Sequence, residues 1–301
     1  MELKDIFSRI RELKKGIPIR YKSKSVRFGE NKSAFKGSGY EIAEISRWRE
    51  GEPLKNISWG LSIRDFPKKI YKVEKIENKE IPVIIFVDIS NSILFQISET
   101  SNNAQLLLEL IGIIGLTCAR FQDPVGLVGF SDRVNIYLKP KPSRSYVFYM
   151  IKLIFDRIES IKGELKSKDN TDINQALKVL IGKKGKISAI FISDFVNLIN
   201  DEESIDWKLL GNLSSRHNII FIFLDDPLEF KWKMSLGVVP VKNLETGETD
   251  FIRGHLASKI RGDVERRRNF LIERLKKIRV NSIVLSYGSH VINLAKFFSQ
   301  K

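Results

Sequence analysis

The chain has 301 residues, of which 43% are hydrophobic, so it is long enough to bury a core of ordinary size in one main domain with a smaller attachment. Its net charge of +15 would favour acidic partners, but the basic residues are dispersed, which indicates a solvated basic surface rather than a nucleic-acid site. A single cysteine, Cys118, excludes an internal disulfide and fits a reducing compartment.

The first 80 residues divide into a helix, a linker and a small module. Residues 3–13 have the spacing of an amphipathic helix, without the continuous apolar stretch that a signal peptide needs. Ser, Lys and Gly dominate residues 14–39, as expected of a linker. We therefore expect an N-terminal helix and basic linker over residues 1–39 and an aromatic-rich module over residues 40–80, with an alternating strand at residues 69–74.

The remaining residues, 81–301, alternate strands with helices. Six of the seven residues from 81 to 87 are apolar, which predicts a strand buried on both faces of a parallel sheet. This alternation predicts an α/β fold with a doubly wound, mainly parallel sheet. Further strands are predicted at residues 125–130, 134–138 (an edge strand), 187–193, 218–224 and 282–286, helices at 103–121, 143–161, 172–181, 203–214, 257–278 and from 291, and a strand-rich insertion near 236–254.

The longest apolar stretch, residues 106–121, bears on the location of the protein. Glu109 interrupts it, and the stretch is shorter than a typical membrane span. Because a signal peptide is also not predicted, we expect a cytoplasmic protein that does not insert into a membrane.

The buried strand at residues 81–87 ends in an acid and two hydroxyls. Asp88, Ser90 and Ser92 follow it in the sequence DISNS. Ligand crevices in open α/β sheets lie at the carboxyl ends of the strands, so these three side chains are expected at such a crevice.

Two later segments place similar oxygen atoms at comparable positions. Asp194 directly follows the strand at residues 187–193, and Thr171 and Asp172 stand at the start of a short helix, which either of them could cap. An Asp or Ser alone would be an ordinary turn residue. The coincidence of three such segments in one predicted sheet indicates a shared site.

Carboxylate, hydroxyl and water oxygens are the ligands that Mg²⁺ prefers, in a near-octahedral shell at about 2.0–2.1 Å. We expect Ser90 and Ser92 to bind Mg²⁺ or Mn²⁺ directly, while Asp88 and Asp194 hold bound waters by hydrogen bonds. A metal with few charged protein ligands stays electrophilic. It could therefore accept a carboxylate from a partner protein.

At this point the sequence resembles a known site. The five residues of the set look like the metal-ion-dependent adhesion site of von Willebrand factor A domains, with DISNS, NTDINQAL and FISD as its three motifs. The set consists of Asp88, Ser90, Ser92, Thr171 and Asp194. The resemblance implies a von Willebrand factor A-like fold for residues 81–301.

The module at residues 40–80 is similar to the signature of the bacterial domain-of-unknown-function family 58, and the resemblance covers about residues 30–300. Matching positions are Gly39, Glu41, Gly51, Ile57, Trp59 and Arg64. The chain departs from the signature at Ile42, Ser46, Trp48, Glu52, Ser58 and Ile63. These departures lie in the module and leave the metal motifs intact.

What the resemblance implies about function is a protein-binding role. Members of that family are similar to proteins that act beside MoxR-type AAA+ ATPases, which remodel or mature client proteins. We therefore expect a non-catalytic, metal-dependent adaptor that binds such an ATPase, a client protein that supplies an acidic residue, or both.

An enzyme is the alternative. A metal-dependent nuclease could use Asp88, Asp172, Asp194 and Asp225, helped by the basic surface, although hydroxyl ligands would be unusual in a two-metal site. A phosphatase of the haloacid dehalogenase type would need an acid where Ser90 stands. The sequence also has no GxSxG elbow and no glycine-rich phosphate loop. A nucleic-acid-binding protein that uses the basic surface is the remaining alternative.

Overall fold

The computed structural model describes residues 3–15, 41–67, 69–76, 81–90, 93, 103–161, 171–225, 238–242, 249–253 and 257–299. The chain divides into two compact units. One, here called the small unit, is Lys24–Glu80, and the other, here called the α/β unit, combines Met1–Ser23 with Ile81–Lys301.

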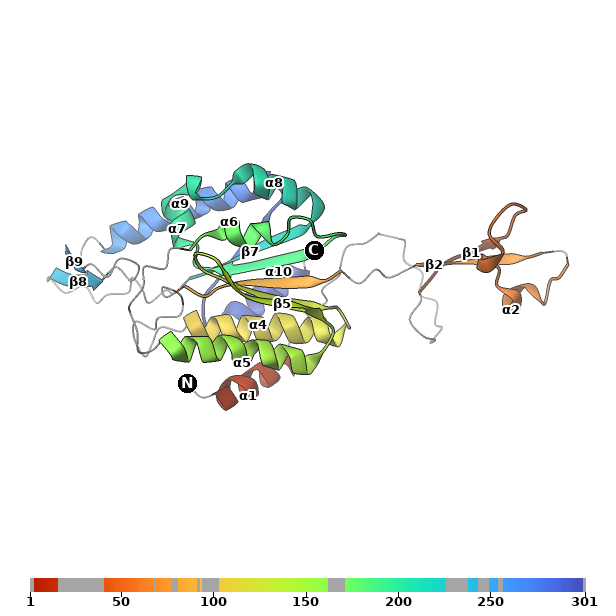
Figure 1. Cartoon of the computed structure of the whole chain (residues 1–301), viewed down its shortest axis with the longest axis horizontal. Coiled ribbons are helices and arrows are strands. Elements are labelled where there is room, and N and C mark those ends of the chain that lie inside the picture. Colours follow the sequence, from red (N-terminus) through yellow and green to blue (C-terminus); the bar gives the residue numbers. More distant parts are fainter. Residues whose placement is uncertain are drawn as a thin grey trace. The chain divides into compact units, whose positions relative to one another are not determined.

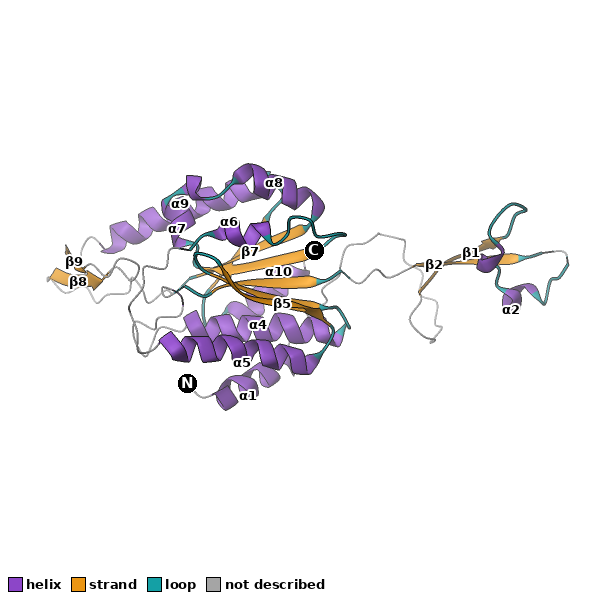
Figure 2. Ribbon diagram, viewed as in Figure 1, coloured by secondary structure: helices purple, strands orange, loops and turns teal. Residues whose placement is uncertain are grey.

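A six-stranded sheet forms the centre of the α/β unit, with the strand order β10-β7-β6-β3-β4-β5 (Figures 1 and 2). All neighbouring strands are parallel except β4 and β5, which are antiparallel. The predicted α/β class with a mainly parallel sheet is therefore confirmed. The strands are β3 (Val83–Asp88), β4 (Val125–Phe130), β5 (Val134–Lys141), β6 (Ser188–Ser193), β7 (Asn218–Leu224) and β10 (Asn281–Leu285).

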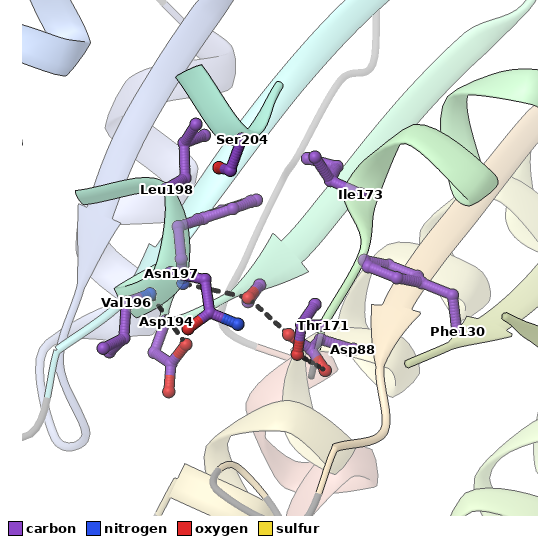
Figure 3. A pocket seen from close by; sticks show the side chains of 11 residues that line it. Asp88, Phe130, Thr171, Ile173, Asp194, Val196, Asn197, Leu198 and Ser204 are labelled. Atoms are coloured by element: carbon purple, nitrogen blue, oxygen red, sulfur yellow. Dashed lines mark hydrogen bonds between the residues drawn. The ribbon is translucent and has the colours of Figure 1, made fainter. Parts of the chain in front are cut away.

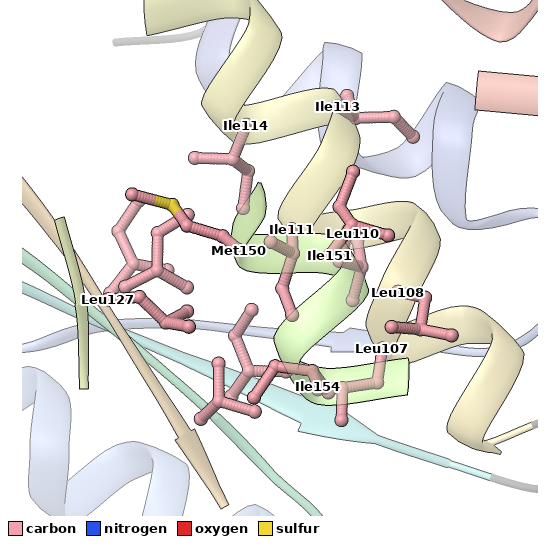
Figure 4. Close-up of a cluster of buried hydrophobic side chains, with 14 of the residues drawn as sticks. Leu107, Leu108, Leu110, Ile111, Ile113, Ile114, Leu127, Met150, Ile151 and Ile154 are labelled. Carbon is pink, nitrogen blue, oxygen red and sulfur yellow. The ribbon is translucent and has the colours of Figure 1, made fainter. Parts of the chain in front are cut away.

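Helices cover both faces of this sheet, because its central strands are apolar on both sides. Ile85 and Val87 of β3 enter one hydrophobic cluster, whereas Ile84 and Phe86 enter the other. Figure 4 shows the first cluster where α4 and α5 meet the sheet. Helices of the first face are α1 (Leu3–Lys15), α4 (Asn103–Arg120), α5 (Arg144–Ile161) and α10 (His290–Ser299), and those of the second are α6 (Ile173–Lys178), α7 (Val196–Asn200), α8 (Trp207–Arg216) and α9 (Ala257–Lys277).

The N-terminal helix α1 packs onto the α/β unit, whereas the sequence predicted one segment of helix and linker over residues 1–39. Ile10 is fully buried against Gly112 of α4, where any side chain larger than hydrogen would meet it. Arg9 also forms an ion pair of 2.9 Å with the buried Glu109. Glu109 lies 2.9 Å from His290 of α10 as well, so a charged group links three helices.

Helix α4 is the one helix of the described ranges that is long and apolar enough to cross a membrane, and 78% of it is buried inside the fold. It packs against α1 and α5 and against strands β3, β4 and β7 (Figure 1). Its apolar surface is thus occupied by protein contacts, as in a core helix.

Several elements differ from the predicted ones. The helix expected at residues 203–214 is instead a 3₁₀ turn, η2 (Glu202–Ser204), followed by α8, whose N-cap Asp206 accepts a hydrogen bond from the Leu209 N–H. The insertion contains an antiparallel pair, β8 (Val238–Lys242) and β9 (Thr249–Arg253). The small unit contains β1 (Glu41–Arg47), which was not predicted, with η1 (Leu54–Asn56), α2 (Trp59–Ser62) and β2 (Tyr71–Ile76).

Candidate metal centre

Strands β3 and β6 are parallel neighbours, so their carboxyl ends place Asp88 and Asp194 at the same edge of the sheet. Both side chains line one pocket, together with Thr171 from the segment that precedes α6 (Figure 3). The cavity volume is about 20 Å³, which is room for about one water molecule or ion.

Asp88 is the centre of the hydrogen bonds in this pocket. Its carboxylate is 1% exposed, and its Oδ2 accepts a hydrogen bond of 2.7 Å from the Ser193 hydroxyl. The other oxygen, Oδ1, accepts from the backbone N–H of Ser90 at 2.9 Å and lies 3.5 Å from the Thr171 hydroxyl. Burial raises the pKa of Asp88, and these donors oppose that shift because they stabilise the carboxylate.

No Lys, Arg or His in the described ranges forms an ion pair with Asp88. A buried carboxylate without a compensating charge is unfavourable, even when it accepts hydrogen bonds. A cation in the pocket would supply that charge. The neighbouring donor atoms are hydroxyl and carboxylate oxygens, which suit Mg²⁺ or Mn²⁺.

The hydroxyl of Ser193 was not assigned to the site from the sequence. It donates to Asp88 and accepts a hydrogen bond of 2.9 Å from the backbone N–H of Phe195. Ser193 therefore connects the end of β3 with the turn that begins α7. Its position directly before Asp194 in FISD was the available signal. Side chains alternate along a strand, so the sequence alone did not predict that both residues would line one pocket.

Asp194 belongs to a tight turn. Its Oδ1 accepts from the Val196 N–H at 3.2 Å, and between them Phe195 has a positive φ of 53°. Burial of the Phe195 ring against Phe221, with centroids 4.9 Å apart, holds this left-handed residue in place. The turn keeps the Asp194 carboxylate at the pocket rather than along the strand.

The segment of Thr171 and Asp172 separates two roles that the sequence left open. Asp172 is the N-cap of α6, since its Oδ1 accepts from the Asn174 N–H at 2.9 Å. Its own N–H donates to the carbonyl of Ser131 at 2.8 Å, which ties the segment to the end of β4. Thr171 is not needed as a cap, and its side chain lines the pocket.

Of the five predicted ligands, Asp88, Thr171 and Asp194 line this pocket, and Ser90 is buried beside it with its backbone bonded to Asp88. Ser92 lies outside the described residues. The structure thus brings together the described side chains of all three motifs.

The four carboxylates of the nuclease alternative are not gathered in one place. Asp172 caps α6, and Asp225 forms an ion pair of 2.7 Å with Arg268. Neither lines the pocket of Asp88 and Asp194. Within the ranges that the structure describes, no three His, Cys, Asp or Glu side chains form a metal-binding group. Asp88 and Asp194 are the carboxylates of the described residues at this pocket, so a metal there would also need hydroxyl or water ligands.

Comparisons with known proteins identify a family. The family model described as "Protein of unknown function DUF58" matches residues 44–269. No curated protein matches the chain. Similar solved structures include the conserved hypothetical protein BatB from Bacteroides thetaiotaomicron, with 16% identity over 73% of this chain and 98% of that chain at a TM-score of 0.41. Another is an uncharacterized membrane spanning protein from Vibrio fischeri, with 13% identity over 72% of this chain and 96% of that chain at a TM-score of 0.22.

Proposed function

The chain belongs to the DUF58 family of proteins of unknown function, and on that premise we propose that it is a non-catalytic, von Willebrand factor A-like adaptor that binds a protein partner through one Mg²⁺ or Mn²⁺. The partner is a MoxR-type AAA+ ATPase, a client protein of such an ATPase, or both, and the protein acts in the cytoplasm.

One observation carries the proposal. The buried carboxylate of Asp88 has hydroxyl donors around it, shares its pocket with Thr171 and Asp194, and forms no ion pair within the described ranges. A divalent cation held by Ser90, Ser92 and Thr171, with Asp88 and Asp194 behind its waters, would satisfy this carboxylate.

The same donor set favours binding over catalysis. A cation with mostly neutral ligands keeps a strong attraction for an additional anion, such as an Asp or Glu side chain of a partner. Metal-dependent hydrolysis would instead need a positioned base for the attacking water. In the described part of the chain, the carboxylates that line this pocket are Asp88 and Asp194, and both accept hydrogen bonds from neighbouring residues.

The small unit offers a second contact surface for the partner. Trp59 is 57% exposed and Ile63 is 75% exposed. Large aromatic side chains are frequent at the energetic centres of protein interfaces. We assign Trp59 and Ile63 to that surface.

Metal binding is tested by titrating Mg²⁺ and Mn²⁺ into chelator-treated protein by calorimetry. We expect one-site binding in the native protein and loss of binding in Asp88→Ala and Thr171→Ala. Lys152→Ala, on an exposed position of α5, is the control and should bind as the native protein does. Folded native protein that binds neither ion would contradict the metal part of the proposal.

Partner binding is tested by capturing the purified MoxR-type ATPase on immobilised protein, with Mg²⁺ or with a chelator. The proposal expects capture only with Mg²⁺, its loss in Asp88→Ala, and a weaker complex for Trp59→Ala. Equal capture with the chelator would refute the metal-dependent contact. Metal-dependent cleavage of DNA or RNA that Asp88→Ala abolishes would replace the adaptor by the nuclease.

A further inference from the structure

A second cavity lies at the opposite edge of the sheet from Asp88, where β6 and β7 begin. Its walls are the turn after α6 and one side of α8, and its volume is about 290 Å³. This volume is close to the lower end of the range for ligand-binding clefts. We call it the basal cavity because it lies at the amino ends of the parallel strands, where Ile187 and His217 directly precede β6 and β7.

The interior of the basal cavity is apolar and firmly built. Leu180 and Leu213 are buried, while Ile181 at the mouth is 56% exposed. His217 connects the start of β6 with α8. Its Nδ1 accepts a hydrogen bond of 3.3 Å from the backbone N–H of Ile187, and its backbone N–H donates to the Leu213 carbonyl at 2.8 Å. The cavity is therefore preformed, and an apolar group could enter it without unfolding either wall.

The rim is cationic. Lys183 and Arg216 both line the cavity. The ammonium of Lys183 donates a hydrogen bond of 2.6 Å to the Tyr137 hydroxyl and lies 4.9 Å from the centroid of that ring. A phenol positions the ammonium but does not cancel its charge. In the described part of the chain, no carboxylate forms an ion pair with Lys183 or Arg216.

Positive charge extends beyond the cavity itself. The stretches of chain that include the lining residues, 173–193 and 207–224, contain no Asp or Glu, and Asp172, Asp194 and Asp206 adjoin them. Their basic residues are Lys178, Lys183, Lys184, Lys186, Lys208 and Arg216. Lys178, Lys184, Lys186 and Lys208 lie outside the cavity lining and are exposed. A ligand that contacted all six basic residues would therefore extend beyond the cavity.

From this combination we propose that the basal cavity is a docking site for an acidic segment of a partner protein, which inserts one or two apolar side chains between α6 and α8 while its Asp and Glu residues contact the cationic rim. The site is separate from the metal centre, because the two lie at opposite ends of the parallel strands. A partner could thus be held at both sites at once, which would raise the overall affinity.

The test measures fluorescence anisotropy of short labelled peptides with the full chain at physiological ionic strength, where purely electrostatic binding is weakened. The main probe has Leu-Phe at its centre, and all of its remaining positions are Asp or Glu. A second probe has Ser-Ser at the centre, a third has Lys in place of the acids, and an oligodeoxythymidine serves as a polyanion without apolar side chains. We expect the main probe to bind at least about tenfold more tightly than the others.

Two variants and one matched control locate the binding. Asn212→Trp places a bulky ring at the lining position of α8, and Lys183→Glu with Arg216→Glu reverses the rim charge. Both should weaken the main probe by at least about tenfold. Arg144→Glu with Lys152→Glu makes the same charge change at exposed positions of α5 and should leave binding unchanged.

Three results would overturn the docking site. These are absence of binding by the main probe, equal binding of the Ser-Ser peptide or the oligonucleotide, and an equal loss in the α5 control. Binding should also persist with chelator and in Asp88→Ala. A failure of the metal-dependent proposal would therefore leave this result unaffected, and the reverse also holds.

Discussion

Replacement of Asp88 by Asn should change the stability of the protein in opposite directions with and without Mg²⁺. Without metal, the native protein at pH 8 must either bury an uncompensated carboxylate or hold a proton on it, and both are unfavourable. The neutral amide of the Asp88→Asn variant would have neither difficulty. With metal, the native carboxylate gains its counter-charge, whereas the amide attracts the cation far less.

The structure allows the balance to be worked out. An amide keeps one acceptor oxygen, so the hydrogen bond from the Ser193 hydroxyl or that from the Ser90 N–H is lost, at about 1–3 kcal/mol. Burial of an unpaired charge costs several kcal/mol. In chelator, the charge that the variant no longer buries outweighs the hydrogen bond that it loses. The free energy of unfolding of Asp88→Asn should therefore exceed that of the native protein by on the order of 1 kcal/mol. Mg²⁺ at about 100 times its dissociation constant adds about 2.7 kcal/mol to the native protein, which reverses the order.

The assay is urea unfolding at pH 8, followed by circular dichroism, for both proteins with chelator and with Mg²⁺. Asp172→Asn is the control, because Asn caps a helix as well as Asp does, and both conditions should leave its relative stability unchanged. If Asp88→Asn were less stable than the native protein in chelator, or if Mg²⁺ did not stabilise the native protein, the account of an uncompensated carboxylate would be wrong.

Three further predictions concern packing and titration. Gly112→Ala would put a Cβ 2.6 Å from Ile10 Cδ1 and should destabilise the fold by about 1–3 kcal/mol in urea unfolding. Gly211→Ala, with open space at its Cβ, should instead stabilise the fold by about 0.5–1 kcal/mol, and equal effects of the two variants would refute the close contact. Burial lowers the pKa of His217, and nearby Arg216 adds to the shift, so the unfolded chain binds the proton first and stability falls as the pH drops below about 6.5. His217→Gln should flatten this part of the curve of unfolding free energy against pH, and an unchanged slope would contradict the prediction. Burial raises the pKa of Cys118 to about 12, so iodoacetamide at pH 8 should label the thiol only after denaturation, as mass spectrometry would show, and rapid labelling of the folded protein would contradict the burial.

Much of the fold follows from the local pattern of the sequence. Strand β4 has the predicted bounds, residues 125–130, because a strand buried on both faces is a continuous apolar run that ends where polar residues begin. The antiparallel β5 was also predicted as an edge strand, since its side chains alternate between half-buried and exposed. The strand-end positions of Asp88 and Asp194 were likewise readable from the sequence, because parallel strands end at a common edge, and Thr171 was readable as a polar residue at the start of a short helix.

Other features depend on contacts between distant segments. The attachment of α1 depends on the burial of Ile10 against Gly112 and on the Arg9 to Glu109 ion pair, more than 90 residues away, so the local sequence of the helix did not reveal it. The hydrogen bond from Ser193 to Asp88 likewise crosses from β6 to β3. Local spacing determines which residues form strands, helices and caps, because those are interactions of near neighbours. Only the packing of the sheet determines which oxygen atoms meet in one pocket and which cations surround the basal cavity, because these groups are brought together by strands and helices far apart in the chain.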